Sequence, residues 1–273
     1  MSSFTHWTPD DARELIAVPR RDDDKYSRGV LGVVTGSTAY PGAAVLGVEA
    51  ALHTGVGMVR YLGPERPTYF VLQRRPETVT VDGRVQAWLV GSGMDAALRD
   101  SETAARMNTA MTAGLPTVVD AGALDLLNDA TGPVIITPHF RELARVIGVS
   151  REQIASDPAG AAWRAAEQLG VTVLLKGHST YVAAPDGTRL VASSAPAWLA
   201  TAGSGDALGG ILGALVATHS EAIAADGSTL ARLGATASVL HGLAAEAASG
   251  GGPFTVLDLA GNVSRVIAEL LNR

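Results

Sequence analysis

The sequence predicts a single α/β domain built on a mainly parallel sheet with helices on both faces. Short apolar runs of strand length alternate with segments of helical periodicity, and Gly-rich turns follow several of these runs. Hydrophobic residues make up 47% of the chain but aromatic residues only 5%, so Ala, Val, Leu and Ile must fill the core, which is typical of buried parallel strands. The 273 residues would allow two smaller domains, but no linker separates them. We therefore expect residues 1–273 to form one domain.

The first half of the chain alternates between strands and helices. Thr8 is a helix N-cap followed by Pro9, and it opens a short helix that runs to about Ile16. The strands that follow are expected at 30–35, 57–62, 87–90, 117–119 and 134–137. One helix is expected to follow the turn at 36–42, with Val45, Val48 and Leu52 on one face. Two more helices are expected at 66–74 and 101–113. This alternation predicts parallel strands joined by helical crossovers.

The second half begins with a helix at 158–169 and then changes pattern. Three strand-like runs at 171–175, 180–183 and 188–192, with a Pro-Asp-Gly turn at 185–187, predict an antiparallel meander. Helices are expected at 207–217, 229–248 and 256–271. The last carries one apolar stripe, Leu259, Val263, Val266, Ile267 and Leu270, so we expect it to pack on the sheet.

Charge and composition exclude several classes of function. A net charge of −6 and a pI near 5.5 argue against a nucleic-acid or anionic-membrane partner. The absence of cysteine excludes disulfides and thiolate metal sites and fits a reducing compartment. The N-terminus lacks the pattern of a signal peptide, and the longest apolar run, 207–217, is too short to span a bilayer. We expect a cytoplasmic protein.

A glycine-rich turn places one carboxylate, Asp206, at the start of the apolar helix at 207–217. The free N–H groups of a helix start and its dipole favour a bound phosphate, so Gly203, Ser204 and Gly205 form a candidate anion cradle. A carboxylate beside that cradle is useful as a base that accepts a proton from an attacking hydroxyl. The alternative is that Asp206 only caps the helix.

Other candidate residues follow predicted strands, where ligands of open α/β sheets bind. They lie in the segments 36–43, 91–94, 120–122, 137–142 and 176–180. For His139 the alternative is a capping or packing role, and for Lys176 it is a solvated lysine. The six histidines are dispersed, so no metal site is indicated. P-loop, hydrolase-elbow and dinucleotide-fingerprint motifs are also lacking.

Taken in order along nearly the whole chain, these segments resemble the ADP- or ATP-dependent NAD(P)H-hydrate dehydratases of the ribokinase-like superfamily. The matching residues are Thr35-Gly-Ser-x-x-Tyr-x-Gly-Ala-Ala44, Gly91-x-Gly93, Asp120-Ala, Thr137-Pro-His-x-x-Glu142, Lys176-Gly-x-x-Thr180 and Ala202-Gly-Ser-Gly-Asp206. The last turn is shared with the kinases of the superfamily, whereas the first segment and the Thr-Pro-His segment point to the dehydratase. The resemblance implies a ribokinase-like fold. It also implies no fused epimerase domain, because the match begins soon after the first helix.

The resemblance assigns roles residue by residue. It implies that Ala43, Gly93, His139 and Asp206 contact the hydrated nicotinamide nucleotide, with Asp206 as the catalytic base. It implies that Lys176, Gly177, His178, Ser179, Thr180 and Gly205 contact the adenine nucleotide. Three positions depart from the usual family pattern: Ser92 replaces a common Pro, Gly122 a common Asp, and Arg141 the usual Gly. Arg141, beside His139, would narrow or recharge the substrate pocket.

The implied function is ADP-dependent (S)-NAD(P)H-hydrate dehydratase, a repair lyase that returns NADHX and NADPHX to NADH and NADPH. ADP, or ATP, would be the cosubstrate with Mg²⁺, and ADP would yield AMP and phosphate. The resemblance also suggests a homotetramer. A ribokinase-like kinase that uses ATP to phosphorylate a small-molecule hydroxyl is the alternative, and a nucleotide-binding module without activity is a third.

Overall fold

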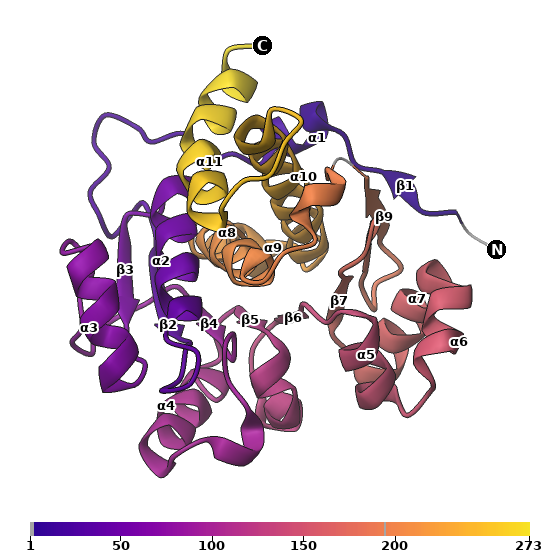
Figure 1. Cartoon of the computed structure of the whole chain (residues 1–273), viewed down its shortest axis with the longest axis horizontal. Helices are drawn as coiled ribbons and strands as arrows, with labels where there is room; N and C mark the ends of the chain where they lie inside the picture. The colour runs from indigo at the N-terminus through magenta and orange to yellow at the C-terminus, as the bar shows by residue number, and fades with distance from the viewer. Residues whose placement is uncertain (1–2, 194) are drawn as a thin grey trace.

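The computed structural model describes residues 3–193 and 195–273. The described strands form one nine-stranded sheet in the order β1-β9-β8-β7-β6-β5-β4-β2-β3 (Figure 1). The strands are β1 Thr5–His6, β2 Val30–Val34, β3 Met58–Tyr61, β4 Ala87–Val90, β5 Thr117–Val119, β6 Val134–Ile136, β7 Thr172–Leu175, β8 Thr180–Ala183 and β9 Arg189–Ala192. Neighbouring strands are parallel except in the pairs β7–β8 and β8–β9, which are antiparallel. The mainly parallel sheet and the antiparallel meander are both confirmed.

Helices and 3₁₀ turns connect these strands. The α-helices are α1 Pro9–Glu14, α2 Gly42–Thr54, α3 Glu65–Arg74, α4 Ser101–Met111, α5 Phe140–Ile147, α6 Arg151–Ser156, α7 Pro158–Leu169, α8 Ser204–Thr218, α9 Ser220–Ala225, α10 Ser228–Ser249 and α11 Val256–Leu271. The 3₁₀ turns are η1 Ala96–Leu98, η2 Ala121–Asp129 and η3 Ala197–Leu199. None of the described helices is both long and apolar enough to cross a membrane.

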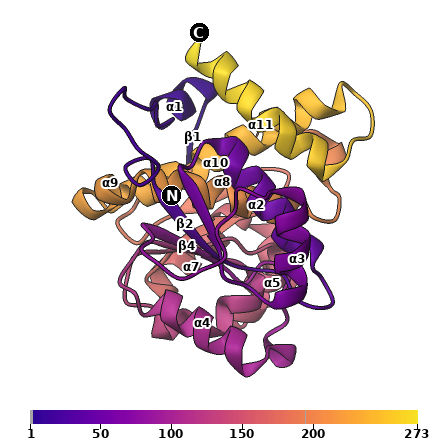
Figure 2. The same cartoon turned by 90° about the vertical axis from the view of Figure 1, so that its left-hand side faces the viewer.

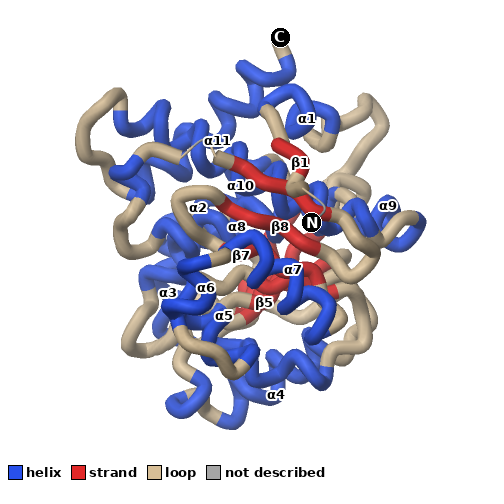
Figure 3. Tube along the Cα trace, turned by 90° about the vertical axis from the view of Figure 1, so that its right-hand side faces the viewer, coloured by secondary structure: helices blue, strands red, loops and turns tan. Residues whose placement is uncertain are grey.

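The sheet lies between two helical layers, each closed by its own apolar core (Figures 1 and 2). Side chains of a strand alternate between its two faces, and β2 shows this directly. Leu31 and Val33 enter the core shared with α8 and α10, whereas Val30 and Val34 enter the core shared with α4. Seen from the other end of the sheet, the strands run as one band between helices (Figure 3). Burial on both faces explains why these strands are almost wholly aliphatic.

Helix α8 is buried on every side, since each residue from Ala207 to Ala217 is buried. It packs on β2, β4 and β5 on one side and against α2 and α10 on the others. Glycines allow this close approach: a Cβ on Gly210 would lie 2.1 Å from the backbone oxygen of Gly47 in α2. The start of α8 is therefore held in a fixed position above the sheet.

The expectation that the last helix packs on the sheet is wrong. Helix α11 lies on α10 and α2, outside the layer that covers the sheet (Figure 2). Its stripe is buried as predicted, but α8 and α10 already occupy that face. The short elements β1, α6 and α9 and the 3₁₀ turns were not expected from the sequence. Elements of this length carry too few residues to show a period.

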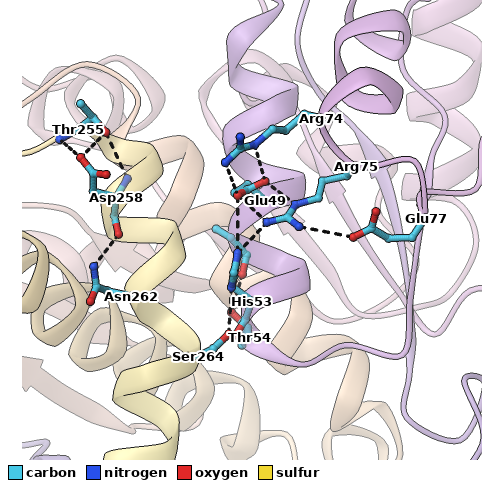
Figure 4. Close-up of polar contacts among 11 residues, drawn as sticks. Glu49, His53, Thr54, Arg74, Arg75, Glu77, Thr255, Asp258, Asn262 and Ser264 are labelled. Carbon is cyan, nitrogen blue, oxygen red and sulfur yellow. Dashed lines mark hydrogen bonds and ion pairs between the residues drawn. The ribbon is translucent and has the colours of Figure 1, made fainter.

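A buried ion-pair network fixes α2 against α3 and α11 (Figure 4). The side chain of Glu49 in α2 is only 1% exposed and accepts hydrogen bonds from Arg74 and Arg75 at 2.6–3.3 Å. Burial alone would raise the pKa of Glu49, but the two guanidiniums outweigh it and lower that pKa. His53 joins the network at Arg75 and contacts Ser264 of α11. The network holds in place the helix whose first turn carries Ala43.

Candidate active site

The loops that follow β2, β4, β5, β6 and β7 lie together at the carboxyl edge of the sheet, because these strands are neighbours. The N–H of Gly36, after β2, donates to the carbonyl of Ser92, after β4, at 2.7 Å. The N–H of Lys176, after β7, donates to the carbonyl of Pro138, after β6, at 2.9 Å. From β2 the chain continues to β3 on one side, whereas from β4 it continues to β5, β6 and β7 on the other side. In sheets of this kind, ligands bind where the strand order reverses, which here is between β2 and β4.

The glycine turn enters this edge as the uncapped start of α8. Gly203 is the N-cap residue, with φ 91°, and no side chain caps the helix. Ser204, Gly205 and Asp206 form the first turn, so the interpretation of Asp206 as a helix cap is wrong. A side chain at Gly203 would be strained by this φ and would meet Leu46 Cδ1 at 2.5 Å. No side chain caps the N–H groups of the turn, as an anion cradle requires, although the N–H of Ser204 donates to the carbonyl of Thr201 at 3.4 Å.

The Asp206 carboxylate is held by Ser92, a residue that stood out in the sequence only because it departs from the family pattern. Ser92 Oγ donates a short hydrogen bond to Asp206 Oδ1, and Ser92 is only 2% exposed. Burial raises the pKa of Asp206 and the nearby Asp120 raises it further, while Ser92 and Lys176 lower it. The balance is a raised pKa, which makes this carboxylate a stronger proton acceptor than an ordinary aspartate.

Lys176 lies across the glycine turn from Asp206. Its Nζ pairs with Asp120 Oδ1 at 3.1 Å, and the same oxygen accepts from Thr137 Oγ1 at 2.8 Å. The side chain is 21% exposed, so it is not the solvated lysine of the alternative interpretation. Burial opposes its charge, but the surrounding carboxylates outweigh burial and raise the pKa of Lys176. A Cβ on Gly205 would lie 3.4 Å from Nζ, so the lysine is poised directly over the cradle.

His139 caps helix α5, as the structural alternative for this residue predicts. Its Nδ1 accepts from the N–H of Glu142 at 3.2 Å, and the Glu142 carboxylate accepts in return from the N–H of His139 at 2.8 Å. Its Nε2 lies 3.1 Å from Glu142 Oε1. The side chain remains 51% exposed, so capping leaves part of the ring accessible to a ligand.

Ala43 and Gly93 lie against each other where α2 meets the loop after β4. Ala43 is 7% exposed in the first turn of α2, and Gly93 has φ 66° in the loop after β4. A Cβ on Gly93 would lie 2.2 Å from that of Ala43, so only glycine fits between the two loops. The structure therefore brings both residues to the edge that carries Asp206.

The remaining predicted nucleotide residues lie in the β7–β8 turn. Gly177 and His178 line a pocket of about 430 Å³ together with Lys176 and His139. Ser179 Oγ is 3.2 Å from Ser193 Oγ, and Thr180 begins β8. Neither residue is among those that line that pocket.

Two residues near the site were not expected from the sequence. His241 in α10 is 6% exposed and lies near the backbone of Ser204 in the glycine turn. Burial lowers the pKa of His241 to about 4, so the ring is neutral at physiological pH. Arg151, at the start of α6, lines the same pocket as Lys176. Both come from elements distant in sequence, and no local motif marks them.

No group of three or more His, Asp or Glu side chains within residues 3–193 and 195–273 could hold a metal ion. The site offers backbone N–H groups, the half-buried Asp206 carboxylate, and Lys176 paired with the buried Asp120. That combination suits a phosphorylated ligand whose hydroxyl loses a proton.

Comparison with known proteins identifies the family. A model of the NAD(P)H-hydrate dehydratase family matches residues 31–259. The chain belongs to this family. It is 36% identical over 270 residues to the ADP-dependent (S)-NAD(P)H-hydrate dehydratase of Neisseria meningitidis serogroup B, covering 92% of this chain and 88% of that protein. It is 42% identical over 213 residues to the bifunctional NAD(P)H-hydrate repair enzyme of Mycobacterium tuberculosis. That match covers 74% of this chain and 43% of the longer enzyme, so the chain spans less than half the length of this relative.

Solved structures agree with the family assignment. The ADP/ATP-dependent NAD(P)H-hydrate dehydratase from Bacillus subtilis, co-crystallised with ATP and Mg²⁺, superposes with a TM-score of 0.86 at 25% identity. The match covers 99% of this chain and 100% of that one. A ribokinase-like superfamily protein from Enterococcus faecalis has a TM-score of 0.84 at 20% identity, with 99% and 97% of the chains covered. The fold is therefore ribokinase-like, as the resemblance implies.

Proposed function

We propose that this family member is an ADP-dependent (S)-NAD(P)H-hydrate dehydratase that restores NADH and NADPH from NADHX and NADPHX. The observation that carries the proposal is the placement of Asp206 in the uncapped first turn of α8, with Ser92 on its carboxylate and Lys176 across the turn. The Neisseria relative, which bears this name, supports the choice of reaction. We assign substrate contacts to Ala43, Gly93, His139 and Asp206.

The chemistry begins with a poor leaving group. Hydrated NADH carries a hydroxyl at C6 of the nicotinamide ring, and hydroxide leaves poorly. Asp206 takes the hydroxyl proton, and the oxygen attacks the terminal phosphorus of ADP. An O–P bond forms, the bond between the terminal phosphorus and the bridging oxygen breaks, and AMP leaves. The N–H groups of Gly203 to Asp206 and the Lys176 ammonium stabilise charge on the transferring group.

Elimination completes the repair. The lone pair of the ring nitrogen moves in as the C6–O bond breaks, phosphate leaves with the original hydroxyl oxygen, and C5 loses a proton. The reduced nicotinamide ring is restored, and the sum is one ADP converted to AMP and phosphate per hydrate. A kinase of the same fold would stop at the phosphate ester.

We assign the adenine nucleotide to the β7–β8 turn and the cradle, with contacts from Lys176 to Thr180 and from Gly205. Mg²⁺ would bind together with the nucleotide phosphates, because Mg²⁺ keeps several waters and is usually held by substrate phosphates. When bound it neutralises phosphate charge. The ATP and Mg²⁺ in the Bacillus structure support this cosubstrate class.

We further propose that residues 1–273 act as one dehydratase unit in a cytoplasmic homotetramer. The resemblance supports the tetramer, and the lack of cysteine fits a reducing compartment. Light scattering coupled to size exclusion measures the assembly: a mass four times that of the chain is expected, and a monomer would contradict it.

The test of the function is incubation of the pure protein with NADHX, Mg²⁺ and either ADP or ATP. Recovery of reduced-nicotinamide absorbance that depends on the nucleotide is expected, with AMP and phosphate as products from ADP. Accumulation of a stable phosphorylated product would instead indicate the kinase alternative. No nucleotide-dependent recovery would refute the proposal. In the same assay Asp206→Asn should abolish turnover while ADP binding persists, and near-normal turnover would refute the role of this carboxylate.

A further inference from the structure

The pocket beside Lys176 carries more positive charge than the proposed contacts use. It is lined by His139, Phe140, Arg141, Arg151, Lys176, Gly177 and His178, with no Asp or Glu among them. Two guanidiniums and the Lys176 ammonium therefore line one pocket of about 430 Å³. Asp120 pairs with the ammonium from outside this lining, so the two guanidiniums are the positive charge that remains. This concentration occurs in a chain whose net charge is −6.

Both arginines in this pocket are unneutralised. Arg141 and Arg151 are exposed, and neither makes a hydrogen bond or ion pair to any part of the chain that the structure describes. Other arginines of the described residues include paired ones, such as Arg99 with Asp125 at 2.8 Å and Arg232 with Asp226 at 2.6 Å, and exposed ones without a side-chain partner, such as Arg145. Arg141 and Arg151 differ from the latter because both line one pocket. Two free guanidiniums that share one pocket point to an anionic ligand.

The backbone that carries Arg141 is held in place by the contacts of its two sequence neighbours. Its neighbours in sequence are Phe140, whose ring edge lies 3.1 Å from the position of a Cβ on Gly177, and Glu142, which closes the capping box with His139. Arg141 therefore emerges from a rigid first turn of α5, directly beside the β7–β8 turn. Arginine suits such a position because its planar fork binds two phosphate oxygens at once.

We propose that Arg141 and Arg151 bind phosphate groups of a ligand that extends past Lys176 into this pocket. The inference rests on the proposed function for the identity of the ligand, since each of its two substrates carries phosphates. The phosphates belong either to the adenine nucleotide or to the dinucleotide. In the dinucleotide they are the pyrophosphate or, in NADPHX, the additional 2′-phosphate. This assignment gives Arg141 a binding role at a position where the family usually has glycine.

The test compares Arg141→Ala, Arg151→Ala and the double variant with Arg145→Ala. Arg145 is a matched control because it lies one turn further along α5, is exposed and is not among the pocket residues. Its loss changes the net charge by as much as each single variant, and Arg145→Ala combined with Arg141→Ala matches the charge of the double variant. Calorimetry would measure binding of ADP, ATP, NADH and NADPH, and steady-state assays would measure KM for NADHX and NADPHX. For the ligand whose phosphates enter the pocket, the double variant is expected to bind roughly tenfold more weakly than wild type, with a shallower salt dependence.

The outcomes separate the possible phosphates. Weaker binding of ADP and ATP alone identifies the nucleotide phosphates, weaker binding of NADPH and NADPHX alone identifies the 2′-phosphate, and weaker binding of both dinucleotides identifies the pyrophosphate. Each supports the proposal, and Arg141→Lys should restore part of the affinity. The proposal is overturned if the double variant matches Arg145→Ala for every ligand. The calorimetric binding measurements do not require turnover. A failure of the proposed function would therefore be recognised separately, because no NADH would be recovered in the activity assay.

Discussion

Replacing Ser92 by alanine tests how far Ser92 lowers the pKa of Asp206, the proposed catalytic base. Ser92 donates to Asp206 Oδ1 and is almost fully buried, so alanine removes the donor and leaves little room for water to replace it. A hydrogen bond to a charged group contributes about 1.5–3 kcal/mol. Because about 1.36 kcal/mol corresponds to one pKa unit, the pKa of Asp206 should rise by roughly one to two units.

The direction of the pKa change follows from which protonation state of Asp206 the Ser92 hydrogen bond stabilises. Ser92 donates to the ionised carboxylate, so losing the donor favours the protonated form and raises the pKa. Only the ionised carboxylate accepts the hydroxyl proton. The acid limb of the kcat/KM profile should therefore move to higher pH, and the variant should lose most activity at low pH and approach wild type at high pH.

The assay is the pH profile of NADHX turnover for wild type, Ser92→Ala and Ser92→Thr. Threonine keeps the hydroxyl and is the matched control, so its acid limb should stay close to that of wild type. Carboxyl-carbon NMR of Asp206 gives the same pKa without turnover. An unmoved acid limb and an unmoved Asp206 pKa in Ser92→Ala would refute the reasoning, as would an equal shift in Ser92→Thr.

Three further substitutions probe the frame of the site. Gly203→Ala should lower the thermal midpoint, because φ 91° strains alanine and its Cβ meets Leu46 at 2.5 Å; an unchanged midpoint in calorimetry would contradict this. Glu49→Gln should lower the free energy of unfolding in urea by roughly 3 kcal/mol, since it removes the buried carboxylate charge between Arg74 and Arg75 and leaves Arg75 only the longer contact with Glu77. The folded-state pKa of Glu49 is lowered, so this contribution is present above its unfolded pKa and is lost as pH falls through the folded value; a pH-independent difference would argue against the ion pair. Gly93→Ala should raise KM for NADHX more than it weakens ADP binding, because its Cβ meets Ala43, and an equal loss of both would show a general collapse.

Many of the strands and helices were predictable from the sequence, because their hydrophobic periodicity involves only residues that are close together in the chain. The strands at 87–90, 117–119 and 180–183 and the helices at 158–169 and 256–271 have the predicted ends. Gly, Pro and Asp mark these ends through their own backbone preferences. The ribokinase-like assignment likewise followed from turns that carry their signature in a few consecutive residues.

Partners across the fold were not predictable in the same way. The stripe of α11 shows which face is buried but not that α10 and α2 cover it. Ser92 and Asp206 are 114 positions apart, and nothing near either residue indicates the bond between them. Asp206 could not be distinguished from a helix cap until the structure placed Gly203 at the N-cap. Such contacts depend on which strands become neighbours in the sheet.

The most direct test of the central claim is to follow the oxygen of the C6 hydroxyl. NADHX prepared by hydration in ¹⁸O-water carries the label at that oxygen, and turnover with ADP in ordinary water releases phosphate for mass analysis. Phosphoryl transfer onto the hydroxyl, followed by elimination, predicts one ¹⁸O in each phosphate formed alongside AMP and NADH. Unlabelled phosphate with the label released as water would contradict activation of the leaving group at the turn of Gly203 to Asp206.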